Sequence, residues 1–392
     1  VNVSARDRAP YTKCPRGQCQ RADDVKRRVT IRPGKVQAAR TTPRRTVGRP
    51  AWRTALVAPA ARGARRAGLA DQSRRAGSAQ PDVPYFHWQC KVYLYNFIRL
   101  GIPAENIHVL FSLTTPISKP SDGALSLTAF TKNIHFYEDT RDKKHYIPSI
   151  KPFLITKWLK QFPENGEKFF LHDSDIIFRE LPDFEKMLGD EIVYMSNTKG
   201  YISHSYIMSC GKRYSKKHNL PEDKLLNDMA YCIGVEPYII KNAENKSGGA
   251  QYIFKNQNHY VWFKIYKDSN KLYDMLLSFQ KRYPIKPGEI QFWTAEMWST
   301  LWNMWYFGFR TEVTEDLDFC WATDNLDRYN ETPILHMAGV TEKDKTTKFY
   351  KGDYINKNPI KILKENPEHF NYIDLDNSTI KYINEIKEMI QK

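Results

Sequence analysis

The chain has 392 residues and a formal net charge of +16, and 41% of its residues are hydrophobic. This length allows one large domain or two smaller ones. No run of about 18 apolar residues occurs, and the chain does not open with a charged and then apolar signal peptide, so we expect a soluble protein without a membrane-spanning helix.

The positive charge is concentrated near the N-terminal end. Residues 1–80 contain 17 Arg and 3 Lys against four acidic residues and so carry the whole net charge. They are poor in aromatic residues and show no helical periodicity, which favours a disordered leader over an arm that binds nucleic acid or an anionic membrane. The abrupt change from Arg to Lys after this segment suggests a separate origin. We expect a disordered leader at 1–80, one folded domain at 81–392 and no nucleic-acid partner.

From Pro84 onward, predicted helices and strands alternate. In chain order they are a helix at 85–99, strands at 106–113 and 134–139, a helix at 149–162 opened by Ser149, strands at 168–178 and 191–197, a helix at 221–234, strands at 238–242 and 251–256, helices near 258–282 and 289–307, a strand at 334–340 and a terminal helix ending at Lys392. This alternation is typical of βαβ units and predicts an α/β fold with a largely parallel sheet.

Asp173 and Asp175 follow the apolar residues 169–171 at the end of a predicted strand. In an extended segment, residues i and i+2 point to the same side, so both carboxylates can bind one cation. A divalent cation would bridge them to the diphosphate of a nucleotide-sugar, which the carboxylates alone would repel. D-x-D is often only a solvated turn, but the apolar residues on both sides make a surface turn a poorer explanation here.

Two later segments contain further candidates. His336 follows a predicted strand, where it is either a core histidine or a third metal ligand, and Gly339 would let the backbone approach a phosphate. Gly248 and Gly249 form either a hairpin turn between strands 238–242 and 251–256 or a backbone surface that lies against a sugar.

Glu296 is the single acid in the aromatic segment 293–305, whose tryptophans we expect in the core. A buried carboxylate is costly without a partner, so Glu296 is a catalytic candidate. Cys14 and Cys19 lack the further ligands of a zinc site. The four remaining cysteines are expected to be buried thiols, although one disulfide stays possible; they are Cys90, Cys210, Cys232 and Cys320.

Five segments and their order along the chain indicate a family resemblance. They are PYFHWQC (84–90), YIPSIKPFLITKWL (146–159), LHDSDIIF (171–178), WTAEMW (293–298) and HMAG (336–339). This order resembles the plant hydroxyproline O-arabinosyltransferases and the related peptidyl-serine galactosyltransferases. More distantly, the chain is similar to retaining glycosyltransferases of the glycogenin type. The resemblance implies a GT-A fold, which is a Rossmann-like three-layer α/β/α sandwich with a mostly parallel central sheet, and a location in the Golgi lumen.

The resemblance also implies an activity. It is the transfer of a sugar, with retention at the anomeric carbon, from a nucleotide-diphosphate sugar to a hydroxyl of protein hydroxyproline or serine or of a glycan, with Mn²⁺ or Mg²⁺. The implied metal ligands are Asp173, Asp175 and His336. The implied donor-binding residues are Asp173, Lys151, Gly248, Gly249, Gly339 and a lysine after Gly339, which is Lys343 or else Lys345 or Lys348. Glu296 would face the sugar or the acceptor as the catalytic residue.

The chain departs from these families in two places. Gly339 is followed by VTEKDK instead of K-P-W, and the first strand of the nucleotide-binding sheet is replaced by SRRAGSAQPDV (73–83), so we expect that strand to be missing or supplied by residues 54–60. Two alternatives remain. One is a non-catalytic carbohydrate-binding protein that uses the tryptophans. The other is a metal-dependent phosphatase of the haloacid-dehalogenase type, which needs a small hydroxyl residue where this chain has Ile177.

Overall fold

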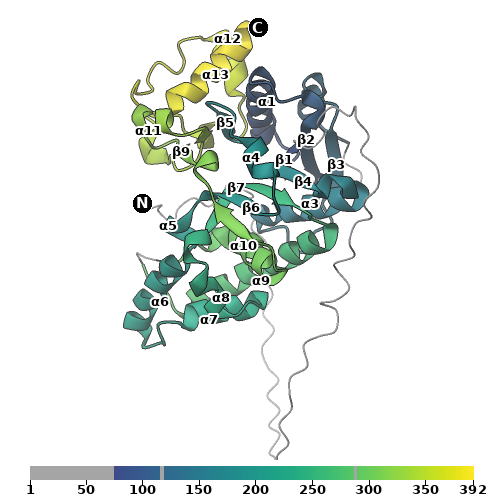
Figure 1. The fold of residues 1–392 in the computed structure, drawn as a ribbon. Helices are drawn as coiled ribbons and strands as arrows, with labels where there is room; N and C mark the ends of the chain where they lie inside the picture. Colours follow the sequence, from purple (N-terminus) through teal and green to yellow (C-terminus); the bar gives the residue numbers. More distant parts are fainter. Residues whose placement is uncertain (1–74, 115–118, 287–288) are drawn as a thin grey trace, which may run out of the picture. The chain divides into compact units, whose positions relative to one another are not determined.

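The computed structural model of the protein describes residues 75–114, 119–286 and 289–392 (Figure 1). Residues 1–74 of the predicted leader lie outside the described residues. The same holds for the substitute strand at 54–60 and for Cys14 and Cys19, so these predictions stay predictions.

A seven-stranded sheet forms the centre of the described part, in the order β3-β2-β1-β4-β7-β6-β8. Its strands are β1 (Arg75–Pro81), β2 (Ile107–Leu113), β3 (Ile134–Glu138), β4 (Lys168–Leu171), β6 (Val193–Asn197), β7 (Gly248–Lys255) and β8 (Thr311–Val313). Neighbouring strands run parallel except where β7 pairs with β4 and β6. The predicted α/β fold with a mostly parallel central sheet is confirmed.

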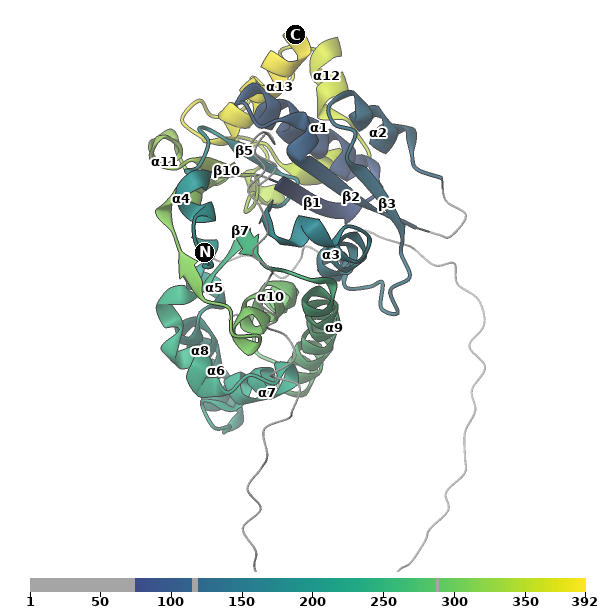
Figure 2. The ribbon, with the colours of Figure 1, turned by 45° about the vertical axis from the view of Figure 1, so that its right-hand side comes forward.

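Helices cover both faces of this sheet. The helices of the described residues are α1 (Pro84–Arg99), α2 (Asp122–Leu125), α3 (Ile150–Gln161), α4 (Phe184–Leu188), α5 (Lys199–Ile202), α6 (His204–His218), α7 (Lys224–Ile233), α8 (Pro237–Asn242), α9 (His259–Arg282), α10 (Ala295–Tyr306), α11 (Leu326–Glu331), α12 (Pro359–Glu365) and α13 (Thr379–Gln391). Figure 2 shows α1 on one side of the sheet and α3, α9 and α10 on the other. The result is the expected three-layer arrangement.

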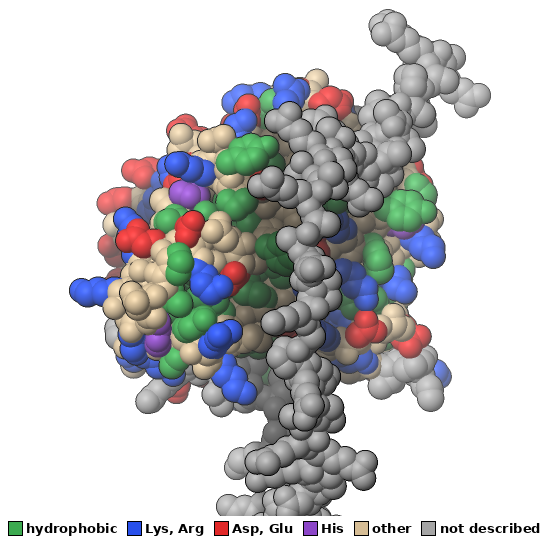
Figure 3. All heavy atoms as spheres, turned by 90° about the horizontal axis from the view of Figure 1, so that it is seen from below, with side chains coloured by type: hydrophobic (Ala, Val, Ile, Leu, Met, Phe, Trp, Pro, Cys, Tyr) green, Lys and Arg blue, Asp and Glu red, His purple; other side chains and the backbone are tan. Residues whose placement is uncertain are grey.

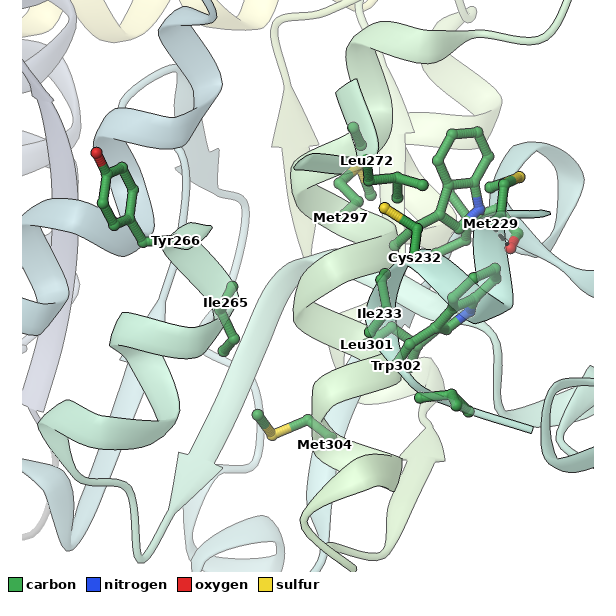
Figure 4. Close-up of a cluster of buried hydrophobic side chains, with 14 of the residues drawn as sticks. Met229, Cys232, Ile233, Ile265, Tyr266, Leu272, Met297, Leu301, Trp302 and Met304 are labelled. Carbon is green, nitrogen blue, oxygen red and sulfur yellow. Dashed lines mark hydrogen bonds between the residues drawn. The ribbon is translucent and has the colours of Figure 1, made fainter. Parts of the chain in front are cut away.

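Side chains that alternate along the strands create one hydrophobic cluster on each face. In β4, Phe169 and Leu171 belong to the larger cluster, whereas Phe170 belongs to the cluster around α1. Figure 4 shows part of the larger cluster, in which Trp302 of α10 lies near Cys232 of α7. The central sheet is therefore buried on both faces, as parallel sheets usually are.

The prediction that the first strand is missing is wrong. Residues 75–81 form β1, which lies between β2 and β4 and pairs in parallel with both. The small residues Ala76, Gly77 and Ser78 are buried there, and the Ser78 hydroxyl lies 2.7 Å from the Tyr93 hydroxyl of α1. The last residues of the predicted leader thus belong to the centre of the sheet.

A second sheet is formed by three short strands in the order β5-β10-β9. They are β5 (Ile176–Phe178), β10 (Ile334–His336) and β9 (Phe319–Trp321). The predicted single strand at 168–178 is therefore two strands, since β4 belongs to the large sheet and β5 to the small one. Residues 172–175 connect the two sheets, which places the Asp173/Asp175 pair at their junction.

Two local predictions need correction, and a third is confirmed. Residues 238–242 lie in helix α8 and not in a strand, because Pro237 occupies the first turn of a helix. Ser149 does not cap α3 with its side chain; its hydroxyl donates to the Tyr146 carbonyl at 2.8 Å. The four described cysteines are free and buried, as expected, and no disulfide joins them.

The described surface mixes charges of both signs. Figure 3 shows Lys and Arg side chains interspersed with Asp and Glu on the face seen from below. This mixture agrees with the balance of 40 basic and 40 acidic residues in 81–392. Among the helices listed above for residues 75–392, none is long and apolar enough to cross a bilayer.

Candidate active site

Strand pairing in the small sheet brings the three predicted metal ligands together. Strand β10 runs antiparallel to β5 with His336 opposite Ile176, and the Met337 backbone N–H donates to the Asp175 carbonyl at 2.9 Å. One ligand atom of each of Asp173, Asp175 and His336 lies within 4.8 Å of the other two. Two distant parts of the sequence thus meet at the junction of the sheets.

Each carboxylate presents one oxygen to the histidine and the other to a lysine. His336 Nε2 lies 3.3 Å from Asp175 Oδ1 and 3.6 Å from Asp173 Oδ2. On the other oxygens, Lys151 Nζ lies 2.7 Å from Asp173 Oδ1, and Lys351 Nζ contacts Asp175 Oδ2. The candidate ligand atoms are therefore His336 Nε2, Asp175 Oδ1 and Asp173 Oδ2, and the lysines contact the other oxygen of each carboxylate.

The charges of this cluster are fixed by their neighbours. Burial raises the pKa of Asp175, but Lys351 and His336 lower it more, so that the pKa lies well below its usual value. Burial lowers the pKa of Lys151 and of Lys351, but the adjacent carboxylates raise each above its usual value. At neutral pH, Asp175 is ionised and both lysines are protonated.

Lys351 contacts the candidate site and was not predicted from the sequence. The resemblance implied Lys343, Lys345 or Lys348 instead. In the structure Lys343 is exposed, Lys345 pairs with Glu342, and Lys348 donates to the Thr323 carbonyl. Lys351 comes twelve residues after Gly339, at the start of the 3₁₀ turn Lys351–Tyr354. The contact of Lys351 with Asp175 depends on how the chain folds between Gly339 and Lys351, which the sequence pattern does not show.

Glu296 lies beside the same cluster, at the start of α10. Its side chain is buried, with Oε2 3.6 Å from Lys151 Nζ and Oε1 accepting from the Thr300 hydroxyl at 3.0 Å. Burial raises the pKa of Glu296 above its usual value although Lys151 lowers it. Lys151 therefore bridges Glu296 and Asp173, and the predicted catalytic carboxylate and the predicted metal ligands share one network.

The segment before α10 is held by Tyr146. Its hydroxyl accepts from the Glu296 backbone N–H at 2.8 Å and donates to the Trp293 carbonyl at 2.7 Å. Trp298 and Trp302 are fully buried in the core as expected, but the side chain of Trp293 is 50% exposed, so the prediction of a core residue is wrong there. An aromatic side chain close to Glu296 in the sequence is thus open to solvent.

Two of the predicted donor-binding glycines, Gly248 and Gly249, stand where neighbouring residues leave no room for a side chain. Gly248 and Gly249 begin strand β7 and do not form the predicted hairpin turn. A Cβ at Gly248 would lie 2.6 Å from the Ser196 carbonyl oxygen, and one at Gly249 would lie 2.6 Å from Met297 Cε. Gly339 follows β10 with a φ of +96°, a conformation that favours glycine. Contact of these glycines with a donor remains a prediction.

Comparison with solved structures finds 203 similar chains, two of which are described below. No family model and no curated protein matches the chain. A structure described as the WbbM bifunctional glycosyltransferase in its apo form is similar with a TM-score of 0.40 and 11% identity, over 78% of this chain and 52% of that one. A glycosyltransferase involved in the glycosylation of the major capsid of PBCV-1 is similar with a TM-score of 0.32 and 10% identity, over 72% of this chain and 98% of that one.

This chain spans about half the length of the WbbM structure. At these TM-scores and identities, neither similarity decides what the chain does, and the function follows from the residues of the site. Those residues are two carboxylates and an imidazole that face one another, two lysines on the outer oxygens and a buried carboxylate next to one lysine. Such a set can bind a divalent cation and a phosphate ester side by side.

Proposed function

We propose that the chain is a metal-dependent glycosyltransferase of the GT-A type, which moves a sugar from a nucleotide-diphosphate sugar to an acceptor hydroxyl. The observation that carries the proposal is the division of the carboxylate oxygens of Asp173 and Asp175, one facing His336 and the other holding a lysine. A diphosphate ester needs a cation and additional positive charge, and this arrangement offers a place for both.

The donor atoms fit a divalent cation. Asp173, Asp175 and His336 would hold it, because carboxylate oxygens with one imidazole nitrogen suit Mn²⁺, and carboxylates suit Mg²⁺. When bound, the cation would neutralise the charge of the departing nucleoside diphosphate. Since the ligand atoms are not the lysine-bound oxygens, occupation of the site does not require either lysine to leave its carboxylate.

The chain's own residues would do the remaining work. Lys151 and Lys351 would bind and orient the diphosphate as point charges. The buried Glu296 carboxylate would face the sugar, where it can stabilise the positive charge that develops on the ring as the glycosidic bond breaks. The resemblance supports retention at the anomeric carbon and an acceptor hydroxyl on protein hydroxyproline, on serine or on a glycan.

The two alternatives have less support. A phosphatase of the haloacid-dehalogenase type needs a small hydroxyl residue where Ile177 stands, and the Ile177 side chain is buried in a core cluster. A carbohydrate-binding protein that uses tryptophans needs several of them at the surface, whereas Trp298 and Trp302 are buried and Trp293 is exposed. The carbohydrate-binding alternative also leaves the two partly buried lysines on the aspartates unexplained.

A thermal-shift screen tests the proposal. Nucleotide-sugars and free sugars are each added to the wild-type protein with and without Mn²⁺, and the melting temperature is measured. A ligand at about 100 times its Kd adds about 2.7 kcal/mol of stability, so a nucleotide-sugar should raise the melting temperature, and more so with Mn²⁺. Stabilisation by free sugars alone, without any response to nucleotide-sugars, would favour the carbohydrate-binding alternative.

The role of Lys351 can be separated from that of Lys343. Lys351→Met is expected to raise the KM for the nucleotide-sugar by roughly 10- to 100-fold, because a hydrogen bond to a charged group contributes about 1.5–3 kcal/mol. Lys343→Met removes an exposed lysine of the same length and should leave KM unchanged. Steady-state kinetics at saturating Mn²⁺ measure both. An effect of Lys343→Met with none from Lys351→Met would reverse the assignment.

A further inference from the structure

A buried polar chain leads from the candidate metal ligand His336 into the large sheet. Gln251 Nε2 lies 3.3 Å from His336 Nδ1, and the Ser196 hydroxyl donates to Gln251 Oε1 at 2.6 Å. Gln251 and Ser196 are both fully buried. Sequence reasoning found neither residue, and the network described above does not use them.

The pairing of β6 with β7 is irregular at Ser196 and Gln251, because the strand register shifts there. Met195 lies opposite Tyr252 and Asn197 opposite Gly248, so three residues of β7 (249–251) face the single residue Ser196 of β6. Within this bulge Ala250 has a φ of +71°, which is unusual for a residue other than glycine. Bulges redirect side chains, and such conformations are found more often at functional sites.

We propose that Gln251 is a positioning residue that holds His336 in the form needed to bind the cation. This inference rests on the proposed metal site. If Nε2 of His336 binds a cation, its proton lies on Nδ1 and needs an acceptor. Rotation of the Gln251 amide by half a turn places Oε1 at that nitrogen and Nε2 at the Ser196 hydroxyl, which can accept a hydrogen bond. The Gln251 amide, held by Ser196, can thus donate to Nδ1 of His336 when no cation is bound and accept from it when a cation is bound.

The alternative, that Gln251 merely fills space in the sheet, predicts a different response to substitution. Residues that hydrogen-bond a metal-ligating histidine usually change metal affinity by about 10- to 100-fold when they are lost. Gln251→Leu keeps the volume but removes the acceptor, whereas Gln251→Glu keeps an acceptor. Gln257→Leu is a matched control, since Gln257 is also buried but donates to the backbone carbonyl of Lys255.

The test measures binding of Mn²⁺ alone, without any donor, by electron paramagnetic resonance titration, together with the melting temperature. Gln251→Leu should bind Mn²⁺ about 10- to 100-fold more weakly than wild type, while Gln251→Glu binds at least as tightly as wild type and Gln257→Leu is unchanged. Wild-type affinity in Gln251→Leu would overturn this inference and leave the metal site standing. If the wild type itself does not bind Mn²⁺, the metal site and this inference both fail.

If Gln251→Leu does not fold, Gln251→Glu still decides the question. A carboxylate at this position accepts from Nδ1 without any amide rotation, so weaker Mn²⁺ binding by Gln251→Glu than by wild type would overturn the inference. Ser196→Ala gives a second check, because loss of its hydroxyl frees the Gln251 amide and should weaken Mn²⁺ binding while the melting temperature of the metal-free protein changes little.

Discussion

Asp173→Asn is expected to lower the turnover of the nucleotide-sugar by about 10³-fold while the fold persists. Asparagine keeps the shape of the side chain but removes a negative charge that binds the cation, and a bound cation contributes several kcal/mol of transition-state stabilisation. The fold should tolerate the change because the Asp173 side chain is 32% exposed and Lys151 keeps Glu296 as a partner. Initial rates at saturating donor and the melting temperature measure the two effects.

Asp318→Asn is the matched control for this variant. Asp318 has a side-chain exposure of 28% and pairs with Arg328, so its loss should disturb a surface ion pair to a similar extent without touching the cation site. We expect full activity from Asp318→Asn. Comparable losses in both variants would show that the effect of Asp173→Asn comes from a general disturbance and not from metal binding.

Glu296→Gln is expected to lower turnover by about 10²-fold or more, which is the usual scale for a positioned acid, base or charge stabiliser. Glutamine can still accept the hydrogen bond from the Thr300 hydroxyl, and Lys151 retains Asp173 at 2.7 Å. Affinity for Mn²⁺ alone should therefore stay near the wild-type value. Kinetics and a Mn²⁺ titration on the same protein sample separate the catalytic effect from a loss of the metal.

The melting temperature of Glu296→Gln should also differ from that of the wild type in its pH dependence. The pKa of Glu296 is raised by burial above its ordinary value of 4.5. The wild type therefore loses stability as the pH rises from 4.5 through the raised pKa of Glu296. Glutamine does not titrate, so the melting temperature of Glu296→Gln relative to wild type should rise over that interval. Glu385→Gln is the control, because it removes a buried carboxylate of α13 that pairs with Arg99 of α1, and it should leave turnover unchanged. Equal kinetic losses in the two variants would make Glu296 a structural carboxylate.

Much of the fold followed from hydrophobic patterning. Helices α1, α3 and α9 and strands β2 and β3 lie within one to two residues of their predicted bounds, because each has a clear apolar period and a breaker such as Pro84 or Gly101. Pattern also placed Asp173, Asp175 and His336 at the ends of strands, and the resemblance implied that the three form a metal-ligand set.

Other features depend on contacts between distant residues, which the local sequence does not reveal. Strand β1 contains Ala76, Gly77 and Ser78, which have low strand propensity and resemble the leader, and it is fixed by its neighbours β2 and β4. Lys351 reaches Asp175 across 176 residues. Gln251 depends on a bulge whose register only the paired strand defines. Tertiary pairing decides each of these cases.

The most direct test of the account is the release of nucleoside diphosphate from a nucleotide-sugar, measured for the wild-type protein in EDTA and again during a titration with Mn²⁺. The account predicts no release in EDTA, recovery as Mn²⁺ is added, and no recovery for Asp173→Asn at the Mn²⁺ concentration that restores the wild type. Equal release by wild type in EDTA and in Mn²⁺, or full activity of Asp173→Asn, would contradict the assignment of Asp173, Asp175 and His336 to a catalytic cation.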